Sequence, residues 1–185
     1  MGEAKLRMSD DVYLAFDRGS EVKHELWDGE VYAMTGASAA HNVIVMNLSY
    51  ELTGALRGSK CRAYPSDMRV RIPKRGYVFP DLTIVCGPSE FEGESDILLN
   101  PRTIIEVLSS STANFDRGDK FSGYSSMPSV EEVLFISQHE RHVEHRVRHP
   151  DSSWVLRNYC GDDAVPLVSL PHPLPLSHIY YDLEV

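Results

Sequence analysis

The stretch that decides the fold is Arg102-Thr-Ile-Ile-Glu-Val-Leu-Ser109, in which one carboxylate, Glu106, lies among threonine, isoleucine, valine and leucine. A run of this length and composition is typical of a central strand that is covered on both faces. A carboxylate on such a strand is costly unless it is paired or binds a cation. Glu106 is therefore the first candidate for a functional residue.

A second acid begins another β-rich run, Pro80-Asp-Leu-Thr-Ile-Val-Cys86. Taken singly, Asp81 is also a common turn or capping residue, and Glu106 is also explained as a buried acid paired with an arginine. If the two strands are neighbours, however, both carboxylates point at one site. Two carboxylates and several waters are what Mg²⁺ prefers, so the pair favours a metal site.

The rest of the chain mixes helices and strands without the regular βαβ order of a Rossmann sheet. Asp28-Gly29 predicts a hairpin between strands at 24–27 and 30–35. Helices are expected at Asp10–Arg18, at 38–56 and at about 117–126, the last capped by Ser109–Thr112 or Asp116. Further strands are expected at 61–65, 67–73, 130–138, 142–149 and 152–159. We expect one α/β domain over residues 1–185, with a mixed central sheet flanked by helices, an N-terminal hairpin and a C-terminal β-rich segment.

Composition limits the function classes. The chain has 185 residues and a formal net charge of −9, which argues against passive coating of nucleic acid but allows a local cationic groove. Cys61, Cys86 and Cys160 are odd in number and form no C-x-x-C motif, so we expect reduced cysteines in a cytoplasmic protein. The sequence contains no signal-peptide pattern and no long apolar run, which predicts no membrane association.

An ordered set of motifs resembles a known family. Pro80-Asp81, with Ile105-Glu106-Val107-Leu108 following, is similar to the PD-(D/E)XK nuclease superfamily. The motifs HELWDGEVYAMTGAS, His41, PDLTIVC, NPRTIIEVLSSST, DRGDKFSGY and PSVEEVLFISQ resemble the Uma-type restriction endonucleases, a bacterial family, from about Lys23 to the C-terminus. The resemblance implies a restriction-endonuclease-like fold, Mg²⁺-dependent endonuclease activity on DNA and a homodimer, since duplex cutters need two sites.

The resemblance also implies a metal site. Asp81, Glu106 and the backbone carbonyl of Val107 are expected to hold Mg²⁺ or Mn²⁺. The superfamily pattern places a lysine two residues after the glutamate, where this chain has Leu108, and we expect Leu108 to point into the same pocket. In the Uma-type pattern the lysine comes from the following helix, which assigns the catalytic cation to Lys120.

Further pocket residues follow from the same pattern. The resemblance implies that His41, in the first turn of the long helix, and a glutamate of the preceding hairpin, assigned to Glu30, belong to the pocket with catalytic roles. An exposed or capping histidine and a surface acid are equally good explanations for these two residues. Gln138, which follows a predicted strand, is expected to line the same cleft.

Two alternatives remain at this stage. The histidines at 139, 142, 145 and 149 match a transition-metal site by composition, but a strand sends the side chains of His142 and His145 to opposite faces. The second alternative is that the chain is a non-catalytic relative that keeps the fold as a DNA-binding or assembly module. Leu108 and the net negative charge favour that second alternative.

Overall fold

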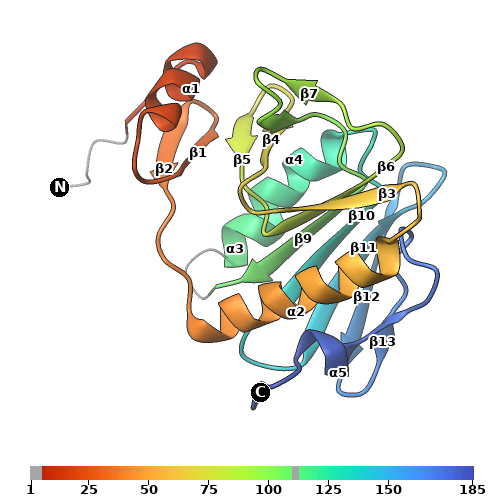
Figure 1. Cartoon of the computed structure of the whole chain (residues 1–185). Coiled ribbons are helices and arrows are strands. Elements are labelled where there is room, and N and C mark those ends of the chain that lie inside the picture. The colour runs from red at the N-terminus through yellow and green to blue at the C-terminus, as the bar shows by residue number, and fades with distance from the viewer. Residues whose placement is uncertain (1–5, 110–112) are drawn as a thin grey trace.

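The structure, a computed structural model, describes residues 6–109 and 113–185. Within these residues the chain builds two six-stranded sheets and a short ribbon of two strands (Figure 1). The central sheet runs in the order β12 (Trp154–Cys160), β11 (His142–Arg148), β10 (Glu132–Ser137), β9 (Thr103–Leu108), β6 (Leu82–Cys86) and β3 (Cys61–Pro65). β9 pairs parallel with β10 and antiparallel with β6, so the strand that carries Glu106 lies inside a mixed sheet, as predicted.

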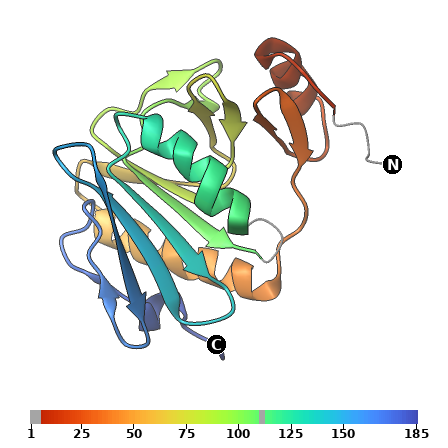
Figure 2. The same ribbon diagram turned by 180° about the vertical axis from the view of Figure 1, so that it is seen from behind.

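Helices cover both faces of the central sheet, as Figures 1 and 2 show from opposite sides. α2 (Ala39–Leu56) and α5 (Leu176–Ile179) pack on one face, where Ile105 and Val107 join their apolar cluster. α4 (Phe121–Ser126) packs on the other face with Ile104 and Leu108. Because side chains alternate along a strand, Glu106 points to the α4 face.

The N-terminal hairpin forms as predicted, but it belongs to a second sheet. That sheet runs in the order β2 (Glu30–Ala33), β1 (His24–Trp27), β5 (Gly76–Val78), β4 (Arg69–Ile72), β8 (Ile97–Leu98) and β7 (Phe91–Glu92). The predicted strand at 67–73 therefore lies outside the central sheet. The second sheet forms because β5 turns back after β4 and pairs with β1 through Leu26 and Tyr77.

Helical segments form in the three regions where the sequence predicted them. α1 spans Asp10–Arg18, as expected, and α2 begins after its N-cap Ser38. The helix predicted at 117–126 begins earlier, as α3 (Ala113–Phe115), and continues through a π-helical turn, η1 (Asp116–Lys120), into α4. The predicted caps at 110–112 lie outside the described residues. Asp116 is not a cap, because it lies inside the helical segment and its side chain is buried.

Helix α4 packs closely against the second sheet at Gly123. A Cβ built on Gly123 would lie 2.6 Å from the Trp27 ring and 2.8 Å from the Ile72 side chain. Only glycine therefore lets α4 pack this closely against the second sheet. The contact brings the hairpin strand β1 beside α4.

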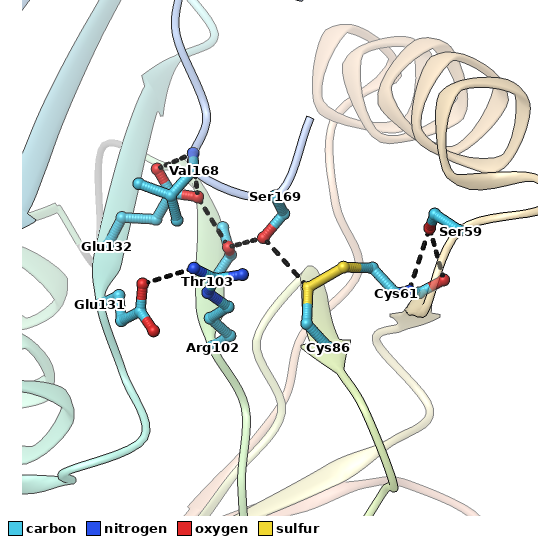
Figure 3. The surroundings of a disulfide bond; sticks show 9 residues. All are labelled: Ser59, Cys61, Cys86, Arg102, Thr103, Glu131, Glu132, Val168 and Ser169. Atoms are coloured by element: carbon cyan, nitrogen blue, oxygen red, sulfur yellow. Dashed lines mark hydrogen bonds and ion pairs between the residues drawn. A yellow bond between two sulfur atoms is a disulfide. The ribbon is translucent and has the colours of Figure 1, made fainter. Parts of the chain in front are cut away.

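The prediction of reduced cysteines is wrong for two of the three. Cys61 and Cys86 lie directly opposite each other on the antiparallel strands β3 and β6, and their sulfurs are bonded (Figure 3). The spacing of the cysteines carries no signal of this bond, because their pairing depends on strand register. Cys160 is free and exposed. Figure 3 also shows Ser169 beside this bond, with its Oγ 3.8 Å from Sγ of Cys86.

Two structures near the C-terminus complete the described chain. β13 (Ala164–Val165) and β14 (Leu174–Pro175) form the short ribbon, and α5 follows it. Among the residues that the structure describes, no helix has the length and apolar content needed to cross a bilayer.

Candidate active site

The helical segment 113–126 turns three side chains toward Glu106. Asp116, Lys120 and Tyr124 recur at every fourth residue and therefore share one helix face. The ammonium of Lys120 lies 3.4 Å from Oε1 of Glu106 and 3.5 Å from Oδ1 of Asp116. The Tyr124 hydroxyl donates a hydrogen bond of 2.5 Å to the same Glu106 oxygen. From the hairpin, Glu25 accepts a hydrogen bond of 3.0 Å from Lys120.

These contacts lie in a desolvated environment that shifts two pKa values. Burial raises the pKa of Glu106 to about 8, Lys120 opposes that rise, and the nearby acids Asp116, Asp81 and Glu25 add to it. Burial lowers the pKa of Lys120, but the attraction of Glu106, Glu25 and Asp116 outweighs it and leaves the Lys120 pKa raised. Lys120 is therefore a buried cation, whereas burial and the neighbouring acids disfavour ionisation of Glu106.

Asp81 lies beside Glu106 as the sequence predicted. Leu82 pairs with Ile105, and the same antiparallel register continued by one residue sets Asp81 opposite Glu106. Oδ2 of Asp81 accepts a hydrogen bond of 2.7 Å from the Val107 N–H. This contact holds the Asp81 carboxylate, just before the first residue of β6, against the backbone of β9.

His41 approaches Asp81 from the first turn of α2. Its Nε2 lies 3.2 Å from Oδ1 of Asp81, while its Nδ1 is buried with no hydrogen-bond partner among the described residues. Oγ of Ser38 accepts a hydrogen bond of 3.1 Å from the His41 N–H and donates one to Oε1 of Gln138. The N-cap of α2 therefore places both His41 and Gln138 at the site.

A pocket of about 550 Å³ opens beside these groups, a size typical of small-ligand sites. Of the residues predicted for the site, it brings together Asp81, Glu106, Val107, Lys120, His41 and Gln138. Its full lining is Glu25, Tyr32, Ala33, Met34, Thr35, Gly36, Ala37, Ser38, His41, Phe79, Asp81, Glu106, Val107, Ser109, Phe115, Asp116, Lys120 and Gln138.

The structure does not bring Glu30 into this pocket, and Glu25 takes the place expected for the hairpin glutamate. Glu30 lies next to the turn on β2, where it accepts hydrogen bonds from Arg7 at 3.2 Å and from the Tyr32 hydroxyl at 2.7 Å. Glu25 lies at the other end of the hairpin and also accepts a hydrogen bond of 2.9 Å from the Phe79 N–H. Both glutamates are on paired strands, so the sequence alone did not distinguish them.

Sequence reasoning also missed Asp116 as a partner of Lys120, and Tyr124 as a partner of Glu106. The four-residue recurrence of these side chains along the helix is the signal that identifies them. The expectation that Leu108 points into the pocket is wrong. Leu108 is on the same face of β9 as Glu106, but it is 4% exposed and packs in the apolar cluster under α4.

The histidine-rich strand serves a structural role. His145 is buried, and its Nε2 lies 2.7 Å from Oε2 of Glu132. His142 contacts Asn158 at 3.1 Å on the opposite face of β11, as strand periodicity predicted. Within 6–109 and 113–185, no three histidine, cysteine or acidic side chains are grouped as a metal site.

Comparison with known proteins identifies the family. The family model Uma2, described as "Putative restriction endonuclease", matches residues 10–178. The chain belongs to the Uma2 family. Two Synechocystis relatives carry the name "Uncharacterized protein": slr1290 is 31% identical over 178 residues, covering 96% of this chain and 93% of that protein. The second, sll1609, is 34% identical over 154 residues, covering 82% of this chain and 87% of that protein.

A solved structure supports the fold of this Uma2-family chain. The crystal structure titled "putative nuclease belonging to DUF820" from Anabaena variabilis superposes with a TM-score of 0.75 at 18% identity. The match covers 93% of this chain and 97% of that chain. It confirms the predicted fold class, a restriction-endonuclease-like mixed sheet flanked by helices.

The donor set is compatible with the divalent ion that the sequence resemblance predicts. A Mg²⁺ ion commonly takes one or two carboxylates and keeps several waters, which Asp81 and Glu106 satisfy. The N–H and C=O of one strand residue point to the same side, so the Val107 carbonyl lies on the side where its N–H meets Asp81. Burial is the main cause of the raised Glu106 pKa, and repulsion from Asp116, Asp81 and Glu25 adds to it; a bound cation would relieve that repulsion.

The raised pKa of Glu106 predicts a pH-dependent stability of the metal-free protein. An unfolded glutamate titrates near its ordinary value, so between that pH and about 8 the folded state binds one proton more than the unfolded state. The contribution of Glu106 to the free energy of unfolding is then largest at low pH and falls as pH rises, by about 1 kcal/mol per pH unit within this window. Glu106→Gln should remove that component.

Urea denaturation at pH 6, 7, 8 and 9 in EDTA measures the effect as the difference between wild type and variant. Glu30→Gln is the matched control, because Glu30 is a hairpin acid outside the pocket. Identical slopes in wild type and Glu106→Gln would show that Glu106 is ionised throughout the range.

Proposed function

We propose that this chain is a Mg²⁺- or Mn²⁺-dependent nuclease that hydrolyses DNA phosphodiester bonds in the pocket lined by Asp81, Glu106 and Lys120. The observation that supports it most is the position of Lys120. An ammonium that is 6% exposed lies within 3.4 Å of Glu106, although it comes from a different element than the motif lysine of the superfamily pattern. Burying a lysine beside three acids is costly, which favours a functional reason for it.

In this proposal Asp81, Glu106 and the Val107 carbonyl hold the ion. The ion supplies Lewis acidity toward water and toward a phosphate oxygen. Asp81 is held in place by the Val107 N–H and by His41. Tyr124 fixes the orientation of Glu106 through its hydroxyl.

Lys120 acts on the phosphate rather than on the ion. Its fixed positive charge stabilises the negative charge that develops on the phosphate oxygens during hydrolysis. Glu25 and Asp116 hold the ammonium in place and keep it protonated. The lysine thus fills the role that the superfamily motif assigns to a residue two positions after the glutamate.

Nicking of supercoiled plasmid and of single-stranded circular DNA, with Mg²⁺, Mn²⁺ or EDTA, tests the proposal. We expect cleavage that depends on the ion, and a loss of at least about tenfold in Glu25→Gln, as for a group that orients the catalytic cation. Glu30→Gln should retain wild-type cleavage. A wild type that binds DNA without cutting it under any of these conditions contradicts the proposal and supports the non-catalytic module.

A further inference from the structure

The pocket has two chemically different kinds of lining residue. The lining combines the acidic side chains and Lys120 with the rings of Tyr32, Phe79 and Phe115, which we call the aromatic wall. Tyr32 and Phe115 have ring centroids 6.1 Å apart, and Tyr32 remains 36% exposed. Tyr32 also pairs directly with Glu25 across the hairpin, which places this ring next to the residue that binds Lys120.

The aromatic wall packs against a buried ring of the second sheet. The Phe115 ring packs edge-on against Trp27 with centroids 5.5 Å apart, and Trp27 is 4% exposed. The segment 34–38 joins β2 to α2 (Figure 1), and all five of its residues line the pocket. Tyr32 lies on β2, and Phe115 lies at the end of α3, where it packs against the buried Trp27.

Charge argues against recognition of a long duplex at this pocket. Among the described residues that line it, four are acidic and one, Lys120, is a lysine or arginine. Duplex binding draws its affinity from many lysine and arginine contacts to phosphates. Binding to unpaired nucleotides relies instead on stacking of bases against aromatic side chains, worth about 1–3 kcal/mol per base.

From these observations, and resting on the proposed nuclease function, we propose that the substrate is single-stranded DNA. One unpaired nucleotide enters the pocket, its base stacks on Tyr32 and Phe115, and its phosphate faces Lys120. The volume of about 550 Å³ falls in the usual range for a small-ligand pocket and is compatible with one nucleotide. A base paired in a duplex would have to be flipped out of its stack to enter, whereas an unpaired base would not. A single strand is cut once, so this substrate does not require the homodimer expected from the sequence.

Binding measurements test the substrate class separately from cleavage. The probes are a fluorescent phosphorothioate oligonucleotide, single-stranded or within a blunt hairpin of the same sequence, followed by anisotropy with Mg²⁺ at several salt concentrations. We expect the single strand to bind at least about tenfold more tightly, with an affinity that falls only weakly with salt because few phosphates are contacted. A hairpin that binds as tightly as the single strand would overturn the inference.

Variants assign the binding to the aromatic wall. Tyr32→Ala should weaken single-strand binding by about tenfold, from the loss of one stacking contact, and Tyr32→Phe should retain it. Tyr50→Ala is the matched control, since Tyr50 is a 79% exposed tyrosine on α2 outside this pocket. Wild-type affinity in Tyr32→Ala would refute the stacking site, provided that its melting temperature equals that of Tyr32→Phe.

The two proposals fail in different ways. Tight single-strand binding that depends on Tyr32, with no cleavage of any DNA, would end the nuclease proposal and leave only the single-strand binding site standing. Ion-dependent cleavage that favours duplex DNA and is unchanged in Tyr32→Ala would leave the nuclease proposal standing and end this inference.

Discussion

Asp81→Asn is expected to abolish ion-dependent DNA cleavage while the protein stays folded. Asparagine keeps a side-chain oxygen that can accept the Val107 N–H, so the junction between β6 and β9 is preserved. The substitution removes one of the two negative charges that the proposed ion needs. We expect a loss of more than about 100-fold, because changes to outer-shell partners of a metal already cost about 10- to 100-fold.

Calorimetric titration with Mn²⁺ and plasmid cleavage measure the two parts of this result. Asp163→Asn is the matched control, because Asp163 also accepts a backbone hydrogen bond, from the Cys160 N–H at 2.8 Å, and does not line the pocket. Mn²⁺ affinity and cleavage at wild-type levels in Asp81→Asn would refute the two-carboxylate site.

Lys120→Met is expected to remove hydrolysis and to preserve, or even strengthen, Mn²⁺ binding. Methionine keeps the apolar stem but removes the cation that neutralises Glu25, Glu106 and Asp116. The loss of cleavage should reach about 100-fold or more, as for groups that stabilise developing charge in a secluded site. Metal affinity should not fall, because the ion no longer competes with a neighbouring positive charge.

Stability reports on the same substitution independently. Leaving buried acids without their cation typically costs about 3–5 kcal/mol, so Lys120→Met should melt at a lower temperature in EDTA and recover part of the loss in Mn²⁺. Lys60→Met, which replaces an exposed lysine between α2 and β3, should change neither property. Cleavage by Lys120→Met at the wild-type rate in saturating Mg²⁺ would show that the lysine is structural.

Because Leu108 lies in the apolar core, a lysine placed at position 108 is not expected to replace Lys120. Returning a lysine to the motif position with Leu108→Lys would bury an ammonium in the apolar cluster under α4. The helical segment 113–126, and not strand β9, therefore places the lysine ammonium of Lys120 beside Glu106. The π-helical turn, Asp116–Lys120, contains this lysine, and such turns occur often at functional sites.

Local pattern was sufficient for much of the fold. The apolar run around Glu106 predicted a central strand, Ser38 and the spacing after it predicted the helix Ala39–Leu56, and Asp28-Gly29 predicted the hairpin. These features depend on residues only a few positions apart, so the sequence pattern is sufficient to predict them. The same reasoning identified Asp81 and Glu106 as candidates, but their meeting depended on the pairing of β6 with β9, which the structure supplies.

Only the tertiary structure decided which side chains meet. The hairpin carries Glu25 and Glu30 on one face, and the choice of Glu25 depends on which end of the hairpin packs against Phe79 and Lys120. Likewise Cys61 and Cys86 meet through the register of two strands separated by the whole β4–β5 hairpin. Periodicity determines which face of an element a residue occupies, whereas long-range packing determines what covers that face.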